Sequence, residues 1–208
     1  MDKGLSYRHG KYITNCISIL EKYMEKKAKK QHYGLLWLDL EMTGLDPSRD
    51  VVLEVAVAAT DLQLETVQLG LDLVIHQPED TLVGMDPWCL EQHTKSGLLA
   101  AVRTSTTSLK DVENYLIEFI DEYCSHERFL FAGNSVHQDR AFLKRYFPRV
   151  DVRGHYRLVD VSTIKELVQA WYPHSPERKF VKNKHHRALE DVSESINELR
   201  HYRKYFFV

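Results

Sequence analysis

Cysteine is scarce in this chain: it has three cysteines among 208 residues. Cys16, Cys89 and Cys124 lie far apart and form no CxxC pair. An odd number of widely spaced cysteines favours a reducing compartment and argues against a disulfide framework or a zinc site. No apolar stretch approaches the roughly 20 residues that a membrane-spanning helix needs, so we expect no membrane span.

A large net charge is also lacking. Lysine and arginine total 28 against 30 acidic residues, which gives a formal net charge of −2. A chain so balanced has no broad electrostatic footprint for a long nucleic acid, although a ligand with few phosphates remains compatible with it. The length of 208 residues suits one α/β domain plus an extension.

One apolar stretch, residues 35–45, carries two acids. It is bounded by Gly34 and by a turn at 44–47, which is typical of a buried strand. Alternation along a strand puts Asp39 and Glu41 on the same face, with Cα atoms roughly 6.5 Å apart. Both carboxylates can then bind one hard cation such as Mg²⁺. Solvated acids at a strand end are the alternative for this pair taken alone.

The sequence pattern of residues 1–33 predicts an appendage to the main domain. Apolar residues recur there at helical spacing and a basic run follows at 26–30, so we expect a helix packed on the domain or on a partner. A mitochondrial presequence is the alternative, and Asp2, Glu21 and Glu25 count against it. We therefore expect an extension at 1–33, a domain at 34–208, and a cytoplasmic protein with a mitochondrial location as the alternative.

The rest of the chain predicts alternating strands and helices. The patterns favour strands at 51–59, 65–75 and 129–132 and a short strand after His155. They favour helices after residue 85, from Ser108 to Tyr123, after Ser135, from near Ser162 to Trp171, and from near 185 to 202. The first three strands are expected to form an antiparallel meander. Glu54 interrupts the second strand, and we expect it to bond neighbouring backbone, with a role as a further metal ligand as the alternative.

Two more acids fall at helix starts. Asp139 lies in the first turns of the helix after the fourth strand, where it also suits the helix dipole. Asp191 lies five residues after His186, and a regular helix would point the two in different directions. If His186 stands at the start of the helix, Asp191 binds metal and the imidazole takes a proton from an attacking water. The alternative is that Asp191 pairs with Arg187 and His186 caps the helix.

The element order predicts the fold class. Strands followed by helices, then alternating strands and helices, indicate an α/β mixed sheet with helices on its faces, the arrangement of the ribonuclease H-like class. In that arrangement the acids converge at one sheet edge. Four carboxylates without a cation would repel one another and raise their pKa values.

Five motif blocks, in order, resemble the oligoribonuclease family, a branch of the DEDD exonucleases that use a histidine. The blocks are Asp39-Leu40-Glu41-Met42-Thr43-Gly44-Leu45, Gly133-Asn134-Ser135 with Asp139, His155-Tyr156-Arg157, Asp160-Val161-Ser162-Thr163, and His186 with Asp191. The resemblance covers nearly all of residues 34–208. The extension at 1–33 lies outside it.

The resemblance implies 3′-to-5′ hydrolysis of very short RNA, down to dinucleotides, to nucleoside 5′-monophosphates. It implies two Mg²⁺ ions, with Mn²⁺ as the alternative, held by Asp39, Glu41, Asp139 and Asp191, and His186 as the base. It further implies substrate contacts from Leu45, Trp88, His93, Ser135, Ser162 and Thr163, and a homodimer in which Tyr156 and Arg157 reach the partner's substrate.

Two other functions stay open on this sequence. One is a DNA exonuclease on the same scaffold, and the other is a nucleotide-binding protein that kept the fold and lost turnover. The second predicts a missing ligand or base, and none of the five catalytic positions is missing here.

Overall fold

The computed structural model describes residues 34–124, 128–181 and 187–207. The chain divides into two compact units, Met1–His32 and Tyr33–Val208, and the structure below is that of the second. The extension and the segment that contains His185 and His186 lie outside the described residues.

Three antiparallel strands open the domain. They are β1 (Leu35–Met42), β2 (Val52–Thr60) and β3 (Val67–Val74). β2 is buried along its whole length, as its run of small and β-branched residues requires. The expected meander is confirmed, although β3 begins later than predicted, because the Asp61 carboxylate accepts the backbone N–H groups of Glu65 and Thr66 and holds them in the turn.

Two parallel strands complete the five-stranded sheet, in the order β3-β2-β1-β4-β5. They are β4 (Leu130–Gly133) and β5 (Leu158–Asp160). β4 pairs with β1 only along Leu35–Trp37. The carboxyl half of β1 therefore extends beyond its parallel neighbour, and its acids lie on this extension. The mixed sheet of the ribonuclease H-like class is confirmed.

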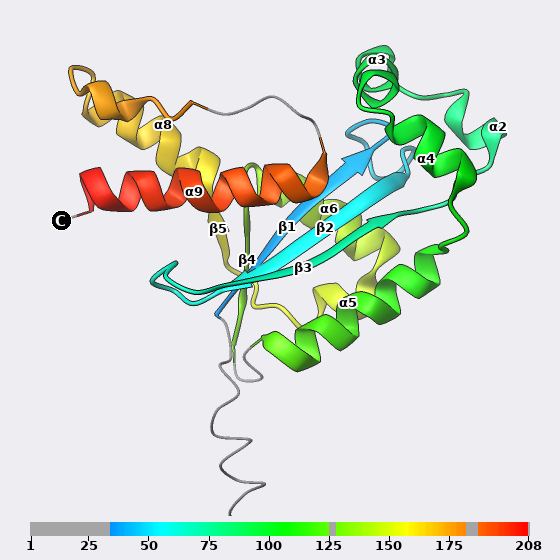
Figure 1. Cartoon of the computed structure of the whole chain (residues 1–208), viewed down its shortest axis with the longest axis horizontal. Coiled ribbons are helices and arrows are strands. Elements are labelled where there is room, and N and C mark those ends of the chain that lie inside the picture. Colours follow the sequence, from blue (N-terminus) through cyan, green and yellow to red (C-terminus); the bar gives the residue numbers. More distant parts are fainter. Residues whose placement is uncertain (1–33, 125–127, 182–186, 208) are drawn as a thin grey trace, which may run out of the picture. The chain divides into compact units, whose positions relative to one another are not determined.

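Helices cover both faces of the sheet, as Figure 1 shows. α5 (Leu109–Tyr123) and α6 (Val136–Tyr146) cover one face, and α8 (Val161–Trp171) and α9 (Ala188–Phe206) cover the other. Alternate residues of β1 supply both cores: Leu36, Leu38 and Leu40 face α5 and α6, whereas Leu35 and Trp37 face α8 and α9. Each fully buried leucine contributes about 1.5–3 kcal/mol.

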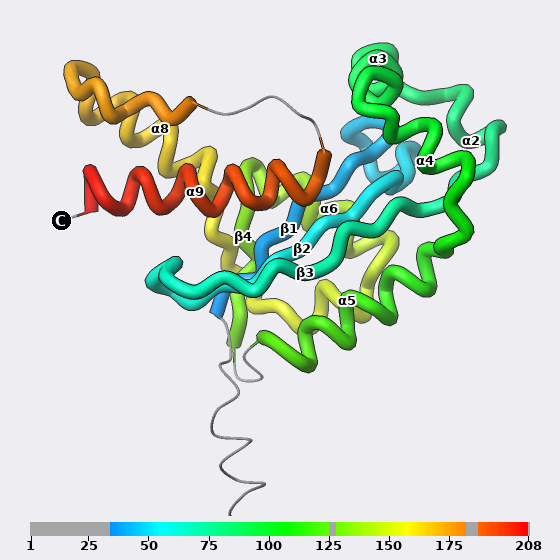
Figure 2. The backbone as a smooth tube through the Cα atoms, in the orientation of Figure 1, coloured from blue at the N-terminus to red at the C-terminus, as the bar shows by residue number. Residues whose placement is uncertain are grey.

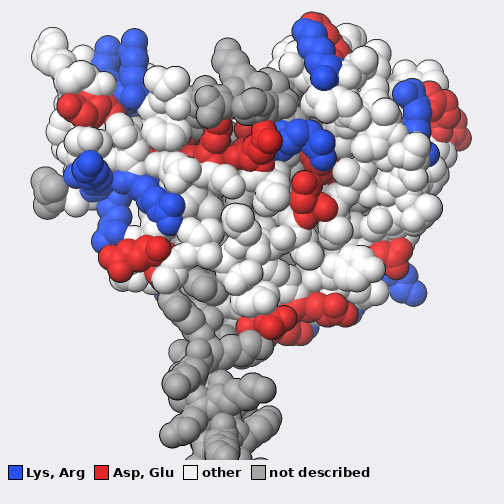
Figure 3. Space-filling model, in the orientation of Figure 1, with Lys and Arg blue, Asp and Glu red and all other residues white. Residues whose placement is uncertain are grey.

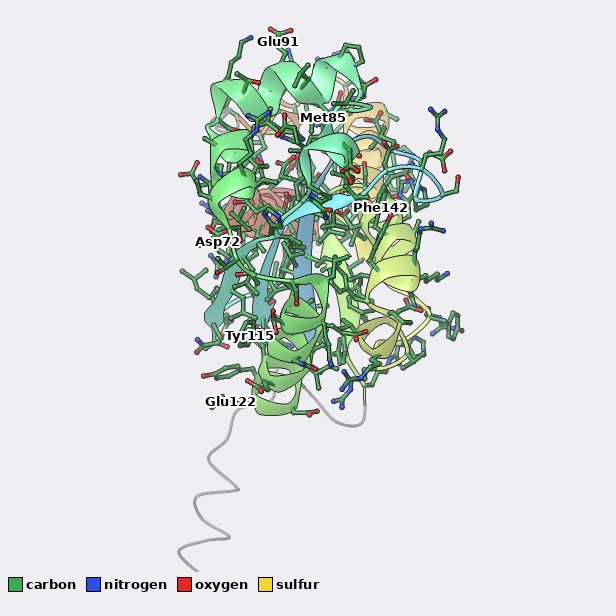
Figure 4. All side chains as sticks on the ribbon, turned by 90° about the vertical axis from the view of Figure 1, so that its right-hand side faces the viewer. Asp72, Met85, Glu91, Tyr115, Glu122 and Phe142 are labelled. Atoms are coloured by element: carbon green, nitrogen blue, oxygen red, sulfur yellow. The ribbon has the colours of Figure 1, made fainter. Side chains whose placement is uncertain are left out.

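Short helices close one end of the sheet. α2 (Glu79–Leu82), α3 (Pro87–Lys95) and α4 (Leu98–Thr104) form a third apolar cluster against Leu53. Figure 2 traces this path from β3 to α5, and Figure 4 labels Met85 beneath α3 and Phe142 on α6. The remaining short elements are α7 (Pro148–Asp151) and the 3-10 turn Pro176–Arg178.

Helix starts follow the polar residues of the sequence. Ser108 and Asp111 form the capping box predicted for α5. α8 begins at Val161, close to the start expected near Ser162, and its cap is Asp160, whose carboxylate accepts the Ser162 N–H. Asp160 is the last residue of β5 and also the N-cap of α8, so the strand ends and the helix begins at this residue.

The cysteines and the helices bear on two further expectations from the sequence. Cys89 and Cys124 are both buried, while Cys16 lies outside the described residues. Among the described helices, none combines the length and apolar character that crossing a bilayer requires.

Candidate active site

Asp39 and Glu41 lie on the face of β1 that also carries Leu35 and Trp37. The row continues toward α9, where the apolar side chains give way to two partly buried carboxylates. Alternation along the strand is the cause, as the sequence predicted. Both acids lie beyond the last residue of β1 that pairs with β4, so no neighbouring strand covers that edge.

Asp191 joins them from α9. One carboxylate oxygen from each of Asp39, Glu41 and Asp191 lies within 4.8 Å of the others, so the three acids can bind one cation. Asp191 stands in the first turn of the helix, and its N–H donates to the Arg187 carbonyl at 3.0 Å. The structure thus brings together residues that are about 150 positions apart in the sequence. Figure 3 shows acidic side chains gathered on this face of the molecule.

Asp139 reaches the same strand from α6, on the side where β4 has ended. Its carboxylate is 6 % exposed and accepts the Leu40 N–H at 3.0 Å. Leu40 stands between the two acids of β1, so the Asp139 carboxylate lies beside them without belonging to the group of three ligand atoms. This position is compatible with a second cation reached directly or through water.

The electrostatics of the site favour a divalent cation. Burial, the charge of Asp191, and then those of Glu54 and Asp139 raise the pKa of Glu41 to about 8. Burial raises the pKa of Asp139 to about 7, against the opposing effect of the Leu40 N–H bond. Acids so placed bind protons at neutral pH unless a cation takes their place. Carboxylate oxygens are the donors that Mg²⁺ and Mn²⁺ prefer, and the residues present therefore fit such an ion.

Glu54 does not bond its neighbouring backbone as predicted. It is fully buried, and its carboxylate pairs with the Arg187 guanidinium and accepts the Ala188 N–H. The expectation was wrong because the partner comes from α9, which is distant in sequence. Arg187 directs its guanidinium at Glu54, so the alternative pairing of Arg187 with Asp191 does not account for that side chain.

A cavity of about 630 Å³ opens where β1 ends. The loop after β1 and the start of α3 line it, and Leu45 and Trp88 are 67 % and 61 % exposed there. Asp50 holds the loop in shape, because its carboxylate accepts the Thr43 hydroxyl and the Asp46 N–H. An exposed leucine and an exposed indole beside a cavity are the surface that a flat base requires.

His93 was expected at the border of a base pocket. The structure places it in the interior, at the end of β1. It is 2 % exposed, its Nε2–H donates to the Met42 carbonyl at 2.9 Å, and its Nδ1 lies 3.8 Å from Glu41. His93 is therefore not a surface imidazole. His93 thus supports the end of β1 through its bond to the Met42 carbonyl. A contact between His93 and substrate stays a prediction.

Hydroxyl groups cluster at the ends of β4 and β5. The Ser135 hydroxyl donates to the Ser162 hydroxyl at 3.2 Å, and the backbone N–H groups of both residues donate to Asp160. Ser162 in turn donates to Asn134. Ser135 adopts a left-handed conformation with φ of 51°, which turns the chain sharply into α6. Thr163, on the next position of α8, is exposed.

Tyr156 and Arg157 project from a turn that Arg140 holds. The Arg140 guanidinium bonds Asp151 and the carbonyls of residues 155 and 156. Tyr156 is 71 % exposed, and the Arg157 guanidinium lies over its ring at 5.3 Å from the centroid. The pair is therefore displayed on a rigid turn, away from the acids of its own domain.

Two residues of this site had no role in the sequence analysis. Asp160 organises both serines, and the exposed His137 lies 3.2 Å from its carboxylate. Asp50 shapes the cavity loop. The position of Asp160 at a strand-to-helix junction was the available indication, whereas nothing local marks Asp50. His186, the predicted base, lies outside the described residues.

Comparison with known proteins decides the family. A family model described as Exonuclease matches residues 36–199. The chain is 48 % identical to an oligoribonuclease of Pseudomonas paraeruginosa over 173 residues, which covers 83 % of this chain and 96 % of the relative. It is 47 % identical to a probable oligoribonuclease of Dictyostelium discoideum over 169 residues, covering 81 % and 88 %. The chain belongs to the oligoribonuclease family. It is an exonuclease of that family.

Solved structures support the fold of this oligoribonuclease family member. An Exonuclease I from Methylocaldum szegediense superposes with a TM-score of 0.62 at 18 % identity, over 83 % of this chain and 40 % of its own length. S. pombe Pop2p, in a form described as Mg²⁺ and Mn²⁺ bound, superposes with a TM-score of 0.57 at 11 % identity, over 93 % and 90 %. This chain thus spans two fifths of that Exonuclease I and most of Pop2p.

Proposed function

We propose that this chain hydrolyses very short RNA from the 3′ end, down to dinucleotides, and releases nucleoside 5′-monophosphates. The observation that carries the proposal is the group of Asp39, Glu41 and Asp191, with ligand atoms within 4.8 Å of one another. The loop that lines the cavity continues directly from the strand that bears two of these acids. A scissile phosphate at the acids therefore has room for its base beside Leu45.

Asp39, Glu41 and Asp191 would hold one divalent ion, and Asp39 with Asp139 would serve a second. When bound, two such ions stabilise the charge on the entering and leaving oxygens of an in-line displacement. The protein's own contribution is a rigid arrangement, because the acids stand on a strand and on the first turns of two helices. Mg²⁺ is the proposed ion, with Mn²⁺ as the alternative.

His186 is proposed as the base that takes the proton from the attacking water. Its sequence position supports this role, since it directly precedes Arg187, which is anchored on Glu54 beside Glu41. A histidine suits the task at neutral pH because its ordinary pKa lies near 6.5.

The other end of the substrate is proposed to lie at the hydroxyl cluster. Ser135, Ser162 and Thr163 would bond the terminal 5′ phosphate, while Leu45 and Trp88 contact the base at the cut end, with His93 behind them. A site closed at both ends holds few phosphates. That requirement agrees with the net charge of −2, which offers no extended track for a longer strand.

A homodimer is part of the proposal. Tyr156 and Arg157 are exposed on a turn fixed by Arg140, and we propose that they reach the substrate bound in the partner. A guanidinium held over an aromatic ring is preorganised, so little side-chain entropy is lost when it meets a phosphate.

We also propose a domain boundary near residue 33 and a cytoplasmic location, with a mitochondrial one as the alternative. Comparing the full chain with one that lacks residues 1–33, in cells and in the assay below, tests both.

The decisive assay compares a diribonucleotide with a 20-nucleotide RNA and the matching DNA oligomers, at equal enzyme concentration, with and without EDTA. We expect rapid cleavage of the diribonucleotide, slow cleavage of the 20-mer, and no cleavage in EDTA. Equal rates at both lengths contradict the proposal for short substrates. Preferential cleavage of DNA favours the alternative of a DNA exonuclease, and no cleavage of any substrate favours a nucleotide-binding protein.

A further inference from the structure

A buried ion pair joins the second strand to the start of the last helix. The Arg187 Nη2–H donates to Glu54 Oε1 at 2.6 Å, and the Nε–H lies 3.0 Å from Oε1 and 3.3 Å from Oε2. The Ala188 N–H donates to Glu54 Oε2 at 3.1 Å. One carboxylate on β2 thus binds both the side chain before α9 and the first backbone amide of the helix.

This pair stands directly beside the proposed metal site. Glu54 is the residue that pairs with Glu41 in the register of β2 and β1. The carbonyl of Arg187 accepts the N–H of Asp191 at 3.0 Å. Fixing Arg187 therefore fixes the first turn of α9, and with it the direction from which Asp191 approaches Asp39 and Glu41.

The helix has no cap of its own at this end. The residue at the N-cap position of α9 is Arg187, and its side chain makes no capping bond. The first amides of a helix need an external acceptor, which serine, threonine or an acid in the preceding residue usually supplies. Glu54 supplies it from another element. The start of α9 is thereby tied to the sheet instead of being stabilised within its own segment.

Stability alone does not explain a charged pair at this place. Glu54 is fully buried and the Arg187 side chain is 35 % exposed. Burying such a pair costs desolvation energy that its attraction often fails to recover, and apolar residues of similar size commonly stabilise a protein as well. A second acid, Asp72 on β3, lies close enough to Glu54 that its pKa is raised first by burial and then by the Glu54 charge. Unlike two apolar side chains, the ion pair makes directional contacts, and these can fix the position of the start of α9.

We infer that Glu54 and Arg187 are positioning residues that hold Asp191 at ligand distance from Asp39 and Glu41, so that the pair sets the affinity of the site for divalent cations. The inference rests on the proposed function, because it takes the three acids as ligands. Neither Glu54 nor Arg187 touches the cation in this account. Groups that orient metal ligands typically change metal affinity by about 10- to 100-fold when they are removed.

Charge and geometry predict opposite results for one substitution, and this makes the inference testable. Arg187→Gln removes a positive charge next to the acids, and that charge lowers the pKa of Glu41. By electrostatics alone, its removal strengthens cation binding. If Arg187 instead acts by holding α9, its removal weakens cation binding, since Asp191 is no longer held at its place.

The experiment measures Mn²⁺ binding to the full chain by electron paramagnetic resonance of the free ion, without substrate. We expect Arg187→Gln and Glu54→Gln to bind Mn²⁺ about tenfold more weakly than the unchanged chain. Unchanged or tighter binding by Arg187→Gln overturns the inference. If Arg187→Gln does not fold, Arg187→Lys keeps the charge and loses the two-pronged contact, and wild-type affinity in that variant overturns the inference equally.

A matched control is available in the same fold. Glu113 on α5 also accepts a backbone N–H and pairs with the guanidinium of the same residue, Arg149 on α7, and neither helix carries one of the four acids. Glu113→Gln should leave Mn²⁺ affinity unchanged, and an equal loss in this control overturns the inference. The variant Asp191→Asn distinguishes a failure of the ligand assignment from a failure of the positioning inference. Wild-type affinity there overturns the ligand assignment and the inference together, whereas weak binding there beside normal binding in Arg187→Gln overturns the inference alone.

Discussion

The carboxylates on the first two strands have different roles, and the groups that each one faces determine its role. Asp39 and Glu41 face other acids, so that the pKa of Glu41 rises to about 8. Glu54, one strand away, faces a guanidinium and a helix amide and makes a stable ion pair. The same residue type therefore serves as a cation ligand in one place and as an anchor in the next.

Replacing Asp39 tests the assignment of the ligands one residue at a time. Asp39→Ala should lower turnover of a diribonucleotide by about 10³-fold or more, because the carboxylate is proposed to serve both ions and to stabilise the transition state through them. Circular dichroism should match that of the unchanged chain, since Asp39 is partly buried and belongs to none of the three apolar clusters. Turnover within tenfold of the unchanged chain would refute the role.

The raised pKa values predict how the metal-free protein responds to pH. Glu41 binds its proton more tightly in the folded chain than in the unfolded one, where its pKa is near 4.5. The folded state therefore holds the extra proton between these values, and the free energy of unfolding falls as pH rises toward about 8. Glu41→Gln should show a smaller fall in urea unfolding between pH 6 and 8.5, and saturating Mg²⁺ should offset the fall in the unchanged chain. Identical slopes for the two proteins would contradict this.

The residues of the site differ in how far sequence alone could find them. Alternation on a strand was enough to place Asp39 and Glu41 together, whereas Asp139 and Asp191 were selected by the family resemblance, because a helix start alone also fits an acid with no ligand role. His93 could not be placed, because its burial depends on the packing of α3 against the end of β1, which no local pattern records. The Arg187 partner of Glu54 is 133 positions away, so a local rule chose neighbouring backbone instead.

At the scale of elements, the loop between β1 and β2 is built around one acid. Asp50 accepts the Thr43 hydroxyl at 3.1 Å and the Asp46 N–H at 2.9 Å, and a Cβ on Gly44 would lie 2.5 Å from its carboxylate. Only glycine leaves room for this contact. The Thr43 carbonyl accepts the Asp86 N–H, which ties the loop to the start of α3. The two walls of the cavity are therefore connected through this loop.

Asp50→Ala should disturb the cavity more than the chemistry. Without its acceptor the loop that presents Leu45 loses its fixed shape, so we expect KM for a diribonucleotide to rise about thirtyfold while kcat changes by less than threefold, if each of the two lost hydrogen bonds is worth about 1 kcal/mol. Steady-state kinetics measure both values. Ser48→Ala, which removes only an exposed hydroxyl that bonds Asp46, serves as the control. A fall in kcat with unchanged KM would contradict the predicted role.

Element types followed from sequence more readily than their ends and junctions. Apolar runs gave the strands, and Ser108 with Asp111 gave the start of α5 correctly. The start of α8 was predicted only approximately, because Asp160 ends a strand and caps a helix at once, two roles that periodicity assigns to different residues. The start of α9 is held from another strand, so its own sequence contains no cap to recognise.

At the scale of the whole molecule, the proposed dimer makes each site depend on both chains. If Arg157 acts on the partner's substrate, mixing Asp39→Ala with Arg157→Ala restores activity, since each mixed dimer contains one complete site. Random pairing makes half of the dimers mixed, so activity should return to about a quarter of the unchanged level. Co-refolding followed by a diribonucleotide assay measures it. No recovery, with mixed dimers present by mass spectrometry, would place Arg157 in its own chain's site.

The convergence of acids from β1, α6 and α9 on divalent ions is most directly tested by anomalous diffraction from crystals that contain Mn²⁺ and a non-hydrolysable diribonucleotide. We predict two anomalous peaks about 3.5–4 Å apart, one bound by Asp39, Glu41 and Asp191 and the other next to Asp39 and Asp139. Absence of any peak at the end of β1, or a peak with Asp191 turned away from it, would contradict the account.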